Sequence, residues 1–247
     1  VRVNEELLEP LMRFLGPLEA GCVSLTEKLV HRRRLALPPG REYALIARLE
    51  RGERVTGAIL QSQSGLYYPV LDPVSPVVEA DAVRRLSRST RRIYSIMGRS
   101  DDVRALEDAF RRPPLQYLEY HLMAQSDPPP ELPLPRVPRE LRIREASERD
   151  ARSLFDIQKK YEIEEVLLPG NTFSPTAAMH HLKQTLRDQV VLVAELDGLP
   201  VGKANTNARG VFFDQIGGVF TERALRSHGI ATALMLRLLE RLASESK

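Results

Sequence analysis

The sequence predicts a mixed α/β (α+β) fold, with a mostly antiparallel central sheet flanked by helices, and two tandem domains. Three observations predict this fold. Apolar segments such as Val190–Glu195 indicate strands, and the dipeptide Asp197–Gly198 is typical of a hairpin turn between two strands. Other segments have apolar residues at helical spacing. A stretch containing six prolines, 127–138, indicates a stiff linker between two domains.

The second domain is expected at residues 139–247. Its first strand alternates apolar and charged residues, and Ser147 is a suitable N-cap for the helix that follows. The next helix begins at Pro175, a position where proline is tolerated. The expected elements are a strand at 141–146, helices at 147–157 and 175–187, strands at 190–195, 201–207 and 215–221, and a helix from about residue 230.

The residues after the strand Gln215–Thr221 predict a site for a phosphorylated ligand. Arg226-Ser-His-Gly-Ile-Ala231 forms a turn that leads into a helix with leucines at helical spacing. Backbone N–H groups at a helix start have no intrahelical partners and lie at the positive end of the helix dipole, so they bind pyrophosphate. Gly229 and Ala231 are expected to be small because a larger side chain would keep the phosphates from the backbone.

This stretch resembles the acetyl-CoA-binding segment of the GNAT superfamily of N-acetyltransferases, whose signature is Arg or Gln, two residues, Gly, one residue, then Gly or Ala. The order of elements over residues 140–247 is also that of the family. The resemblance implies that loop amides bind the pyrophosphate of acetyl-CoA and that the strand pairs with its pantetheine arm. The implied cofactor-binding residues are Val219, Phe220, Thr221, Arg226, Ser227, His228, Gly229, Ile230, Ala231 and Thr232.

The resemblance also implies an acetyl acceptor, which is a primary amine of a small molecule or a peptide. Three acidic residues between the first two helices, Glu162, Glu164 and Glu165, would attract a cationic amine, and a solvated acidic helix end explains them equally well. Asn205 and Asn207 alternate to one strand face and are candidates for substrate contact. A polar, exposed strand face is the alternative explanation for these two asparagines.

The candidate catalytic residues are Asp214, Gln215 and Glu165. Some family members use a glutamate on the strand before the cofactor loop, and Gln215 occupies that position here. Glutamine cannot accept a proton. Asp214 is adjacent, but strand alternation points it to the opposite face unless Gly217–Gly218 marks a bulge. A water relay, or Glu165 reaching over, would serve instead.

A second hypothesis is a non-catalytic protein that senses acyl-CoA or uses the fold as a scaffold. A complete family domain continues beyond the helix that starts near residue 230, so the domain at 139–247 is expected to lack its C-terminal strands. Gln215 and this expected gap favour the non-catalytic hypothesis. The intact loop from Arg226 to Ala231 opposes it only in part, because a sensor would also retain the loop.

The first domain, residues 1–126, is expected to be a degenerate GNAT-like or helper α/β domain. Any α/β chain fits such an order of elements, so the helper interpretation stays open. The junction from Leu71 to Val77 has no glycine, and Pro73 and Pro76 lack the N–H donor that a phosphate site needs. The expected elements are helices at 5–14, 18–30, 77–86 and 103–110, and strands at 43–49, 55–61, 66–71, 93–97 and 116–123.

Composition indicates an intracellular protein with a sizeable core, since 43% of the residues are hydrophobic. The single cysteine, Cys22, excludes an internal disulfide and is expected to be buried. The sequence has no apolar run long enough for a membrane span and no zinc-ligand spacing, so we expect a cytoplasmic location and no metal. A solvated helical face explains the arginine clusters, so nucleic-acid binding is not expected. The sequence leaves the oligomeric state open, and an unpaired sheet edge would invite two chains to pair as a homodimer.

Overall fold

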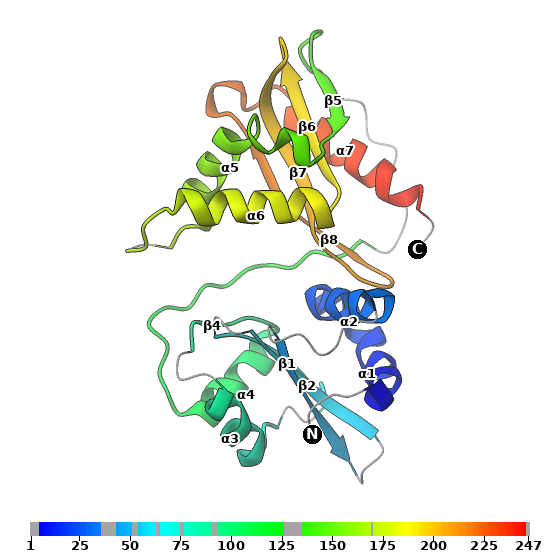
Figure 1. The fold of residues 1–247 in the computed structure, drawn as a ribbon, viewed down its shortest axis with the longest axis vertical. Coiled ribbons are helices and arrows are strands. Elements are labelled where there is room, and N and C mark those ends of the chain that lie inside the picture. Colours follow the sequence, from blue (N-terminus) through cyan, green and yellow to red (C-terminus); the bar gives the residue numbers. More distant parts are fainter. Residues whose placement is uncertain are drawn as a thin grey trace. The chain divides into compact units, whose positions relative to one another are not determined.

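The computed structural model describes residues 5–35, 43–50, 54–62, 65–74, 77–89, 93–125, 135–168 and 170–245. The chain divides into two compact units. The first comprises residues 1–126 and 210–213, and the second comprises residues 127–209 and 214–247. In each unit helices flank a mostly antiparallel sheet, so the predicted fold class is confirmed (Figure 1).

The second unit contains a fully antiparallel sheet of four strands in the order β5-β6-β7-β8. β7 therefore lies inside the sheet and β8 forms one edge. The strands are β5 (Arg142–Glu145), β6 (Val191–Leu196), β7 (Leu199–Arg209) and β8 (Asp214–Thr221). The helices are α5 (Phe155–Tyr161), α6 (Pro175–Asp188) and α7 (Ile230–Ala243), with a π-helical turn at Glu162–Val166 and short 3-10 turns at Glu148–Ala151 and Arg223–Leu225.

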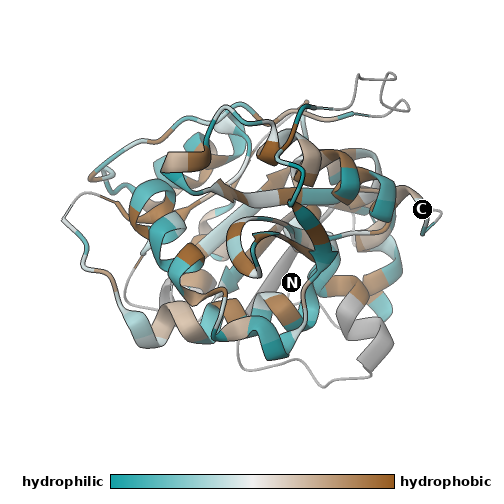
Figure 2. Cartoon of the chain, turned by 90° about the horizontal axis from the view of Figure 1, so that it is seen from above, coloured by the Kyte–Doolittle hydropathy of each residue, from teal (hydrophilic) through white to brown (hydrophobic). Residues whose placement is uncertain are grey.

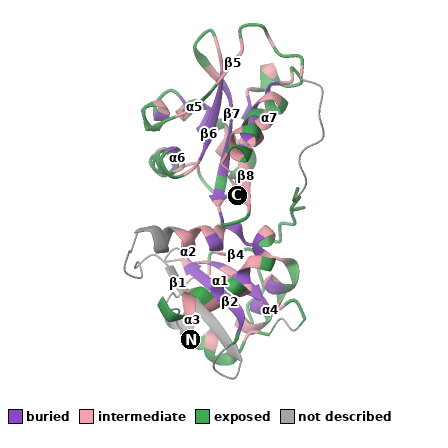
Figure 3. Cartoon of the chain, turned by 90° about the vertical axis from the view of Figure 1, so that its right-hand side faces the viewer, coloured by how far each residue is buried: buried purple, intermediate pink, exposed green. Residues whose placement is uncertain are grey.

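The alternating side chains of β6 divide the core of this unit into two layers. Val191 and Val193 pack in a cluster with residues of α5 and α6, while Leu192 and Ala194 pack in a cluster with α7. Figure 3 shows the same arrangement, with α5 and α6 on one side of the buried strands and α7 on the other. Each face of the sheet is therefore covered by helices.

Short-range interactions define where these elements begin. Ser147 and Asp150 form a reciprocal capping box at the 3-10 turn, and the Ser174 side chain accepts a hydrogen bond from Ala177 N at the start of α6. The hairpin between β6 and β7 turns at Asp197 and Gly198, both with positive φ (50° and 77°). Positive φ at both positions matches the twist of a two-residue hairpin, as the sequence predicts.

The first unit has the strand order β1-β2-β3-β4, in which β4 pairs with β3 in parallel. α1 and α2 pack against one face of this sheet, and α3 and α4 against the other. The elements are α1 (Leu8–Leu15), α2 (Val23–Leu35), β1 (Tyr43–Glu50), β2 (Arg54–Ser62), β3 (Leu66–Leu71), α3 (Ala80–Ser89), β4 (Ser95–Ile96) and α4 (Ser100–Phe110), with 3-10 turns at Glu5–Leu7 and Gly16–Gly21.

The predicted strand at Gln116–Met123 is wrong. These residues have no regular secondary structure, and Leu115, Tyr117, Tyr120 and Met123 are exposed. The alternation of apolar residues is present, but this segment pairs with no strand in the described parts of the chain, and a strand is not stable without a partner.

Two other expectations need smaller corrections. The helix predicted at 18–30 is a 3-10 turn followed by α2 from Val23, and the helix predicted at 77–86 begins at Ala80. The turn expected between the strands at 43–49 and 55–61, Pro76 and most of the proline-rich stretch lie outside the described residues. The arginine side chains at 32–34 and 88–92 also lie outside them.

Cys22 is buried, as predicted. Its Sγ donates a hydrogen bond to the carbonyl oxygen of Leu18 at 3.3 Å. Burial raises the pKa of the Cys22 thiol to about 12, so the thiol is protonated at neutral pH and is a poor nucleophile.

The helices carry both hydrophilic and hydrophobic residues (Figure 2). In the part of the chain that the structure describes, no helix is both long enough and apolar enough to cross a membrane.

Candidate functional site

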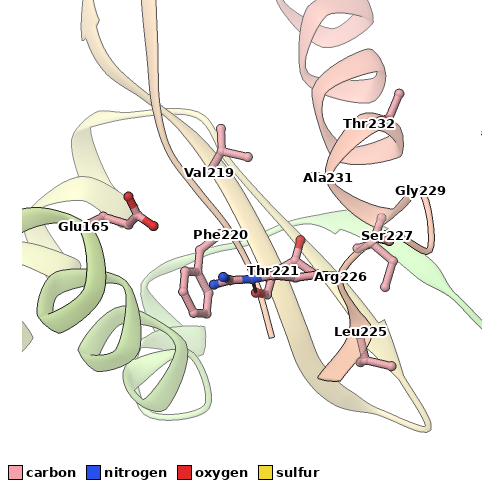
Figure 4. A pocket seen from close by; sticks show the side chains of 11 residues that line it. Glu165, Val219, Phe220, Thr221, Leu225, Arg226, Ser227, Gly229, Ala231 and Thr232 are labelled. Carbon is pink, nitrogen blue, oxygen red and sulfur yellow. Dashed lines mark hydrogen bonds between the residues drawn. The ribbon is translucent and has the colours of Figure 1, made fainter. Parts of the chain in front are cut away.

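A cavity of about 280 Å³ lies in the second unit, where β8 ends and the loop to α7 begins (Figure 4). A glutamate from the π-helical turn also reaches it. Its lining residues are Glu165, Val219, Phe220, Thr221, Leu225, Arg226, Ser227, Gly229, Ile230, Ala231 and Thr232. The cavity therefore contains most of the loop that the sequence predicts to bind a phosphorylated ligand.

Gly229, the residue before α7, has a conformation and a location that exclude other side chains. Its φ is +75°, in the left-handed region that glycine adopts without strain. A Cβ added there would lie 2.7 Å from the carbonyl oxygen of Arg136 and 2.9 Å from Cβ of Pro135. Backbone conformation and space both require glycine at this position.

The start of α7 is suited to an anion. The Ala233 N–H donates to the carbonyl oxygen of Gly229 at 2.9 Å and closes the first helical turn. The N–H groups of Ile230, Ala231 and Thr232 come before this bond, where a helix supplies no backbone acceptor. The first turn contains no acidic residue, so the positive end of the helix dipole is not neutralised there.

Thr221, the last residue of β8, is a further polar group in the cavity lining. Its side-chain hydroxyl is buried and has no hydrogen-bond partner among the described residues. A buried hydroxyl without a partner costs free energy, so the described residues leave this polar atom unsatisfied.

Arg226 is held by protein groups in this structure. Its Nε donates to the carbonyl oxygen of Thr221 at 3.1 Å, and one terminal nitrogen lies 2.6 Å from a carboxylate oxygen of Glu164. Glu164 also pairs with Arg223 at 3.1 Å. The hydrogen bond from Arg226 is the largest cause that keeps the pKa of Glu164 below its usual range. An anionic ligand would compete with Glu164 for this guanidinium.

β8 is irregular at Gly217–Gly218, and the pairing register with β7 shifts there. Gly218 has a φ of +59°. A Cβ on Gly217 would collide with the side chain of Asn207, and a Cβ on Gly218 would collide with Asn205. The glycine pair therefore makes room for a row of polar side chains on β7.

Lys203 belongs to this row and is not among the site residues predicted from the sequence. It is 2% exposed. Its Nζ donates to Asn205 Oδ1 at 2.8 Å and to the carbonyl oxygen of Gly218 at 3.1 Å. Burial lowers the pKa of Lys203 to about 8. Lys203 could have been proposed from the sequence, because residues 203, 205 and 207 of one strand point to the same face of the sheet.

Aromatic rings connect Lys203 to the loop. The Nζ of Lys203 lies 4.7 Å from the centroid of the Tyr161 ring. That ring makes an edge-on contact with Phe220 at 6.4 Å, and the guanidinium of Arg226 lies 5.4 Å from the Phe220 ring centroid. The polar row on β7 and the loop before α7 are thus parts of one packed site.

The structure brings most of the predicted cofactor residues together. Of that set, His228 alone does not line the cavity, and its Nδ1 donates to the carbonyl oxygen of Arg226 at 2.9 Å. Among the candidate catalytic residues, Glu165 lines the cavity, but Asp214 and Gln215 do not. Asp214 pairs with Arg209 at 3.4 Å, and Gln215 lies opposite Ala208.

The predicted substrate residues occupy three environments. Glu162 accepts a hydrogen bond from Gln158 Nε2 at 2.8 Å, while Glu164 pairs with arginines near the loop. Asn205 is buried beside Lys203, and Asn207 is exposed at the glycine pair. Their roles toward a substrate stay predictions.

Comparison with known proteins gives a match to one family over much of the second unit. Residues 152–247 match the model of the acetyltransferase (GNAT) family. No curated protein matches the chain.

Several solved structures are similar to part of the chain. A predicted acetyltransferase from Clostridium acetobutylicum, crystallised with acetyl-CoA, is 23% identical, with a TM-score of 0.34 over 42% of this chain and 74% of its own. A ribosomal-protein-alanine N-acetyltransferase from Brucella melitensis biovar Abortus 2308 is 20% identical, with a TM-score of 0.35 over 43% and 74%. An N-acetyltransferase from Staphylococcus aureus Mu50 is 17% identical, with a TM-score of 0.36 over 43% and 68%.

Proposed function

We propose, because residues 152–247 match the model of the acetyltransferase (GNAT) family, that the protein binds acetyl-CoA in the cavity between β8 and α7 and transfers its acetyl group to a primary amine. The observation that best supports this proposal is the start of α7. Gly229 leaves no side chain at the helix start, and the first-turn N–H groups face no acidic residue of the helix. Such a site suits a pyrophosphate.

Other residues of the cavity fit the rest of the ligand. Thr221 has a buried hydroxyl that finds no hydrogen-bond partner among the described residues, and Thr232 lies in the first turn of α7. β8 is the last strand of its sheet, so the main chain of Val219–Thr221 is placed to pair with the amides of a pantetheine arm. Arg226 would exchange Glu164 for a phosphate oxygen.

Acetyl-CoA supplies an activated acetyl group, and the amine nitrogen forms a C–N bond to the carbonyl carbon while the C–S bond breaks and the sulfur leaves with its electron pair. The chain must attract the amine and accept a proton from its nitrogen. Glu165 lines the cavity, so we assign proton transfer to this carboxylate, directly or through a water molecule. The neighbouring Glu162 and Glu164 add negative charge that attracts a cationic amine.

A non-catalytic sensor of acyl-CoA is the second candidate function. Gln215 favours it, because a glutamine stands where some family members have a glutamate and because Gln215 lies outside the cavity lining. A sensor and an enzyme would bind acetyl-CoA alike. Only turnover separates them.

The test is coenzyme A release from acetyl-CoA in the presence of a panel of amines that includes peptide amino termini, lysine, polyamines and aminoglycosides. We expect amine-dependent release, with kcat reduced at least about tenfold in Glu165→Gln while acetyl-CoA affinity is retained. Glu148→Gln, which removes an exposed carboxylate that does not line the cavity, is the matched control. Acetyl-CoA binding without release for any amine would contradict the enzyme and favour the sensor.

A further inference from the structure

A buried ammonium group lies at the irregular part of β8. Lysine is among the residues that are rarely fully buried without a partner, yet Lys203 is 2% exposed. Its position follows from the sheet register. Lys203 pairs with Val193 of β6, and Val193 faces α5 and α6, so the lysine lies on that face of the sheet.

Within the described residues, few charged groups face this ammonium from the surrounding elements. α5 contributes the phenol ring of Tyr161, and the π-helical turn contributes Glu162, whose charge raises the pKa of Lys203 against the larger effect of burial. The strand neighbours on β6 and β8 are Val193 and Phe220, which are apolar. Glu162 lies in turn 3.9 Å from the ring of His181 on α6.

The carbonyl group that accepts from Lys203 belongs to the peptide that joins Gly218 to Val219. Nζ lies 3.1 Å from the Gly218 oxygen. The described chain has no cis peptide bond, and in a trans peptide the C=O and N–H groups point in opposite directions. The N–H of Val219 therefore points away from the ammonium. Val219 is also where β8 begins to line the cavity.

A cation that binds the oxygen of a peptide makes the N–H of the same peptide a stronger donor. Hydrogen-bonded groups polarise one another in this way, and the effect is larger where water is excluded. Lys203 and Gly218 are both buried. Two hydrogen bonds, to Asn205 Oδ1 and to the Gly218 oxygen, fix the ammonium in place.

We propose that Lys203 is a positioning residue for acetyl transfer, which polarises the Gly218–Val219 peptide so that the N–H of Val219 stabilises negative charge on the acetyl carbonyl oxygen. The inference rests on the proposed function, since it requires acetyl-CoA in the cavity. Hydrogen-bond donors that are already oriented toward a developing oxyanion are a large source of rate enhancement. This arrangement also explains why residue 218 is a glycine, because a side chain there would displace Asn205 and Lys203.

If Lys203 acted instead as a general base, the rate would depend on pH in the opposite way. If Lys203 were a proton acceptor, its neutral amine would be the active form and the rate would rise with pH through the lysine's pKa. A polarising ammonium must be charged. Since the pKa of Lys203 is about 8, the polarising effect is complete well below pH 8 and disappears as the pH rises through that value.

Isotope-edited infrared spectroscopy of protein-bound acetyl-CoA, labelled with ¹³C at the acetyl carbonyl, tests the inference without an acceptor amine. We expect binding to lower the carbonyl stretching frequency, and Lys203→Met to lose at least half of that shift. Lys203→Arg keeps the charge and should restore part of it. In the wild type the shift should decrease between about pH 6.5 and about pH 9.5.

Calorimetric titration with acetyl-CoA and thermal melting accompany the spectra for every variant. Wild-type protein that binds no acetyl-CoA would refute the proposed function, and the inference with it. Binding with an equal carbonyl shift in the wild type and a folded Lys203→Met would overturn the inference alone. A wild-type shift that does not change with pH would do the same, even if Lys203→Met failed to fold.

Discussion

The last long strand of each sheet continues through a loop into a helix, and the two junctions differ. In the first unit, β3 leads to α3 through residues that include Pro73, and β4 pairs with β3 on its other side. In the second unit, β8 leads to α7 through a loop that ends at Gly229, and β8 is the last strand of its sheet. A cavity of about 280 Å³ lies at the second junction.

The contrast shows what a ligand site requires beyond a strand, a loop and a helix. Proline has no N–H to offer, and a strand paired on both sides has no free main-chain groups for an extended ligand. Glycine at positive φ, and a strand that pairs on one side only among the described residues, meet these requirements at the second junction. The candidate site therefore lies at the junction between β8 and α7.

The largest expected effect on stability is at the irregular part of β8. Gly218→Ala places a Cβ against Asn205 and Lys203 at a φ of +59°. Backbone strain and crowding together should lower the free energy of unfolding by roughly 4 kcal/mol. Gly198→Ala, at a φ of +77° with open space around it, should lose only about 1 kcal/mol. Urea denaturation of both variants measures the difference, and equal losses would contradict the crowding.

The next prediction separates scaffold from site. Leu86 on α3 is fully buried and packs with Tyr67 and Leu106 in the first unit. Leu86→Ala should cost about 3 kcal/mol of stability, because a cavity replaces packed atoms. Acetyl-CoA affinity, measured by calorimetry below the melting temperature, should change by less than about twofold. A tenfold loss of affinity would show that the core of the first unit contributes to the site.

A third prediction concerns the opposite edge of the second sheet, where Arg144 of β5 forms ion pairs with Asp150 and Glu195. The Arg144 guanidinium lowers the pKa of Asp150 to about 2, and Asp150 also accepts from Ser147 N at 2.8 Å. Because the folded-state pKa is depressed, this stabilisation is present above the unfolded-state pKa near 4 and is lost as the pH falls toward 2.

Asp150→Asn should therefore destabilise the protein by about 1 kcal/mol at neutral pH and by much less near pH 2. Thermal melting across this pH range is the measurement. Asp156→Asn, which removes an exposed carboxylate at the start of α5, is the control and should show a smaller effect. A loss in Asp150→Asn that is the same at both pH values would exclude ionisation as its cause.

The smallest expected effect is on ligand affinity. Glu164→Gln removes the carboxylate that pairs with Arg226 and should strengthen acetyl-CoA binding about threefold, because exposed ion pairs are weak competitors. In the wild type, phosphate binding to Arg226 would release Glu164 and raise its lowered pKa, so affinity should increase as the pH falls toward the usual range of a glutamate. Calorimetry at several pH values should show this increase only in the wild type. Weaker binding by the variant would mean that Glu164 supports the ligand.

The sequence predicted those elements whose signal is local. The apolar run Val190–Ala194 and the Asp197–Gly198 turn identified β6 and its hairpin, since both patterns depend on neighbouring residues. The segment Gln116–Met123 is also rich in apolar residues and is not a strand, because a strand also needs a partner that local sequence does not specify.

The candidate site divides in the same way. The loop before α7 was predictable because glycine, a helix start and small residues are adjacent in the sequence. Lys203 was not, because its burial and its contact with Gly218 depend on the register between β7 and β8. The position of Glu165 in the cavity, apart from Asp214, likewise depends on how α5 packs on the sheet.

The most direct test of the central claim is a calorimetric titration of the protein with acetyl-CoA, in parallel with Gly229→Glu and Gly198→Glu. Both variants add the same charge at a glycine of similar positive φ (75° and 77°), but only Gly229 lines the cavity. We predict binding to the wild type and to Gly198→Glu, and at least about a hundredfold weaker binding, or about 2.7 kcal/mol, to Gly229→Glu. Equal affinity in all three proteins would contradict a site at the start of α7.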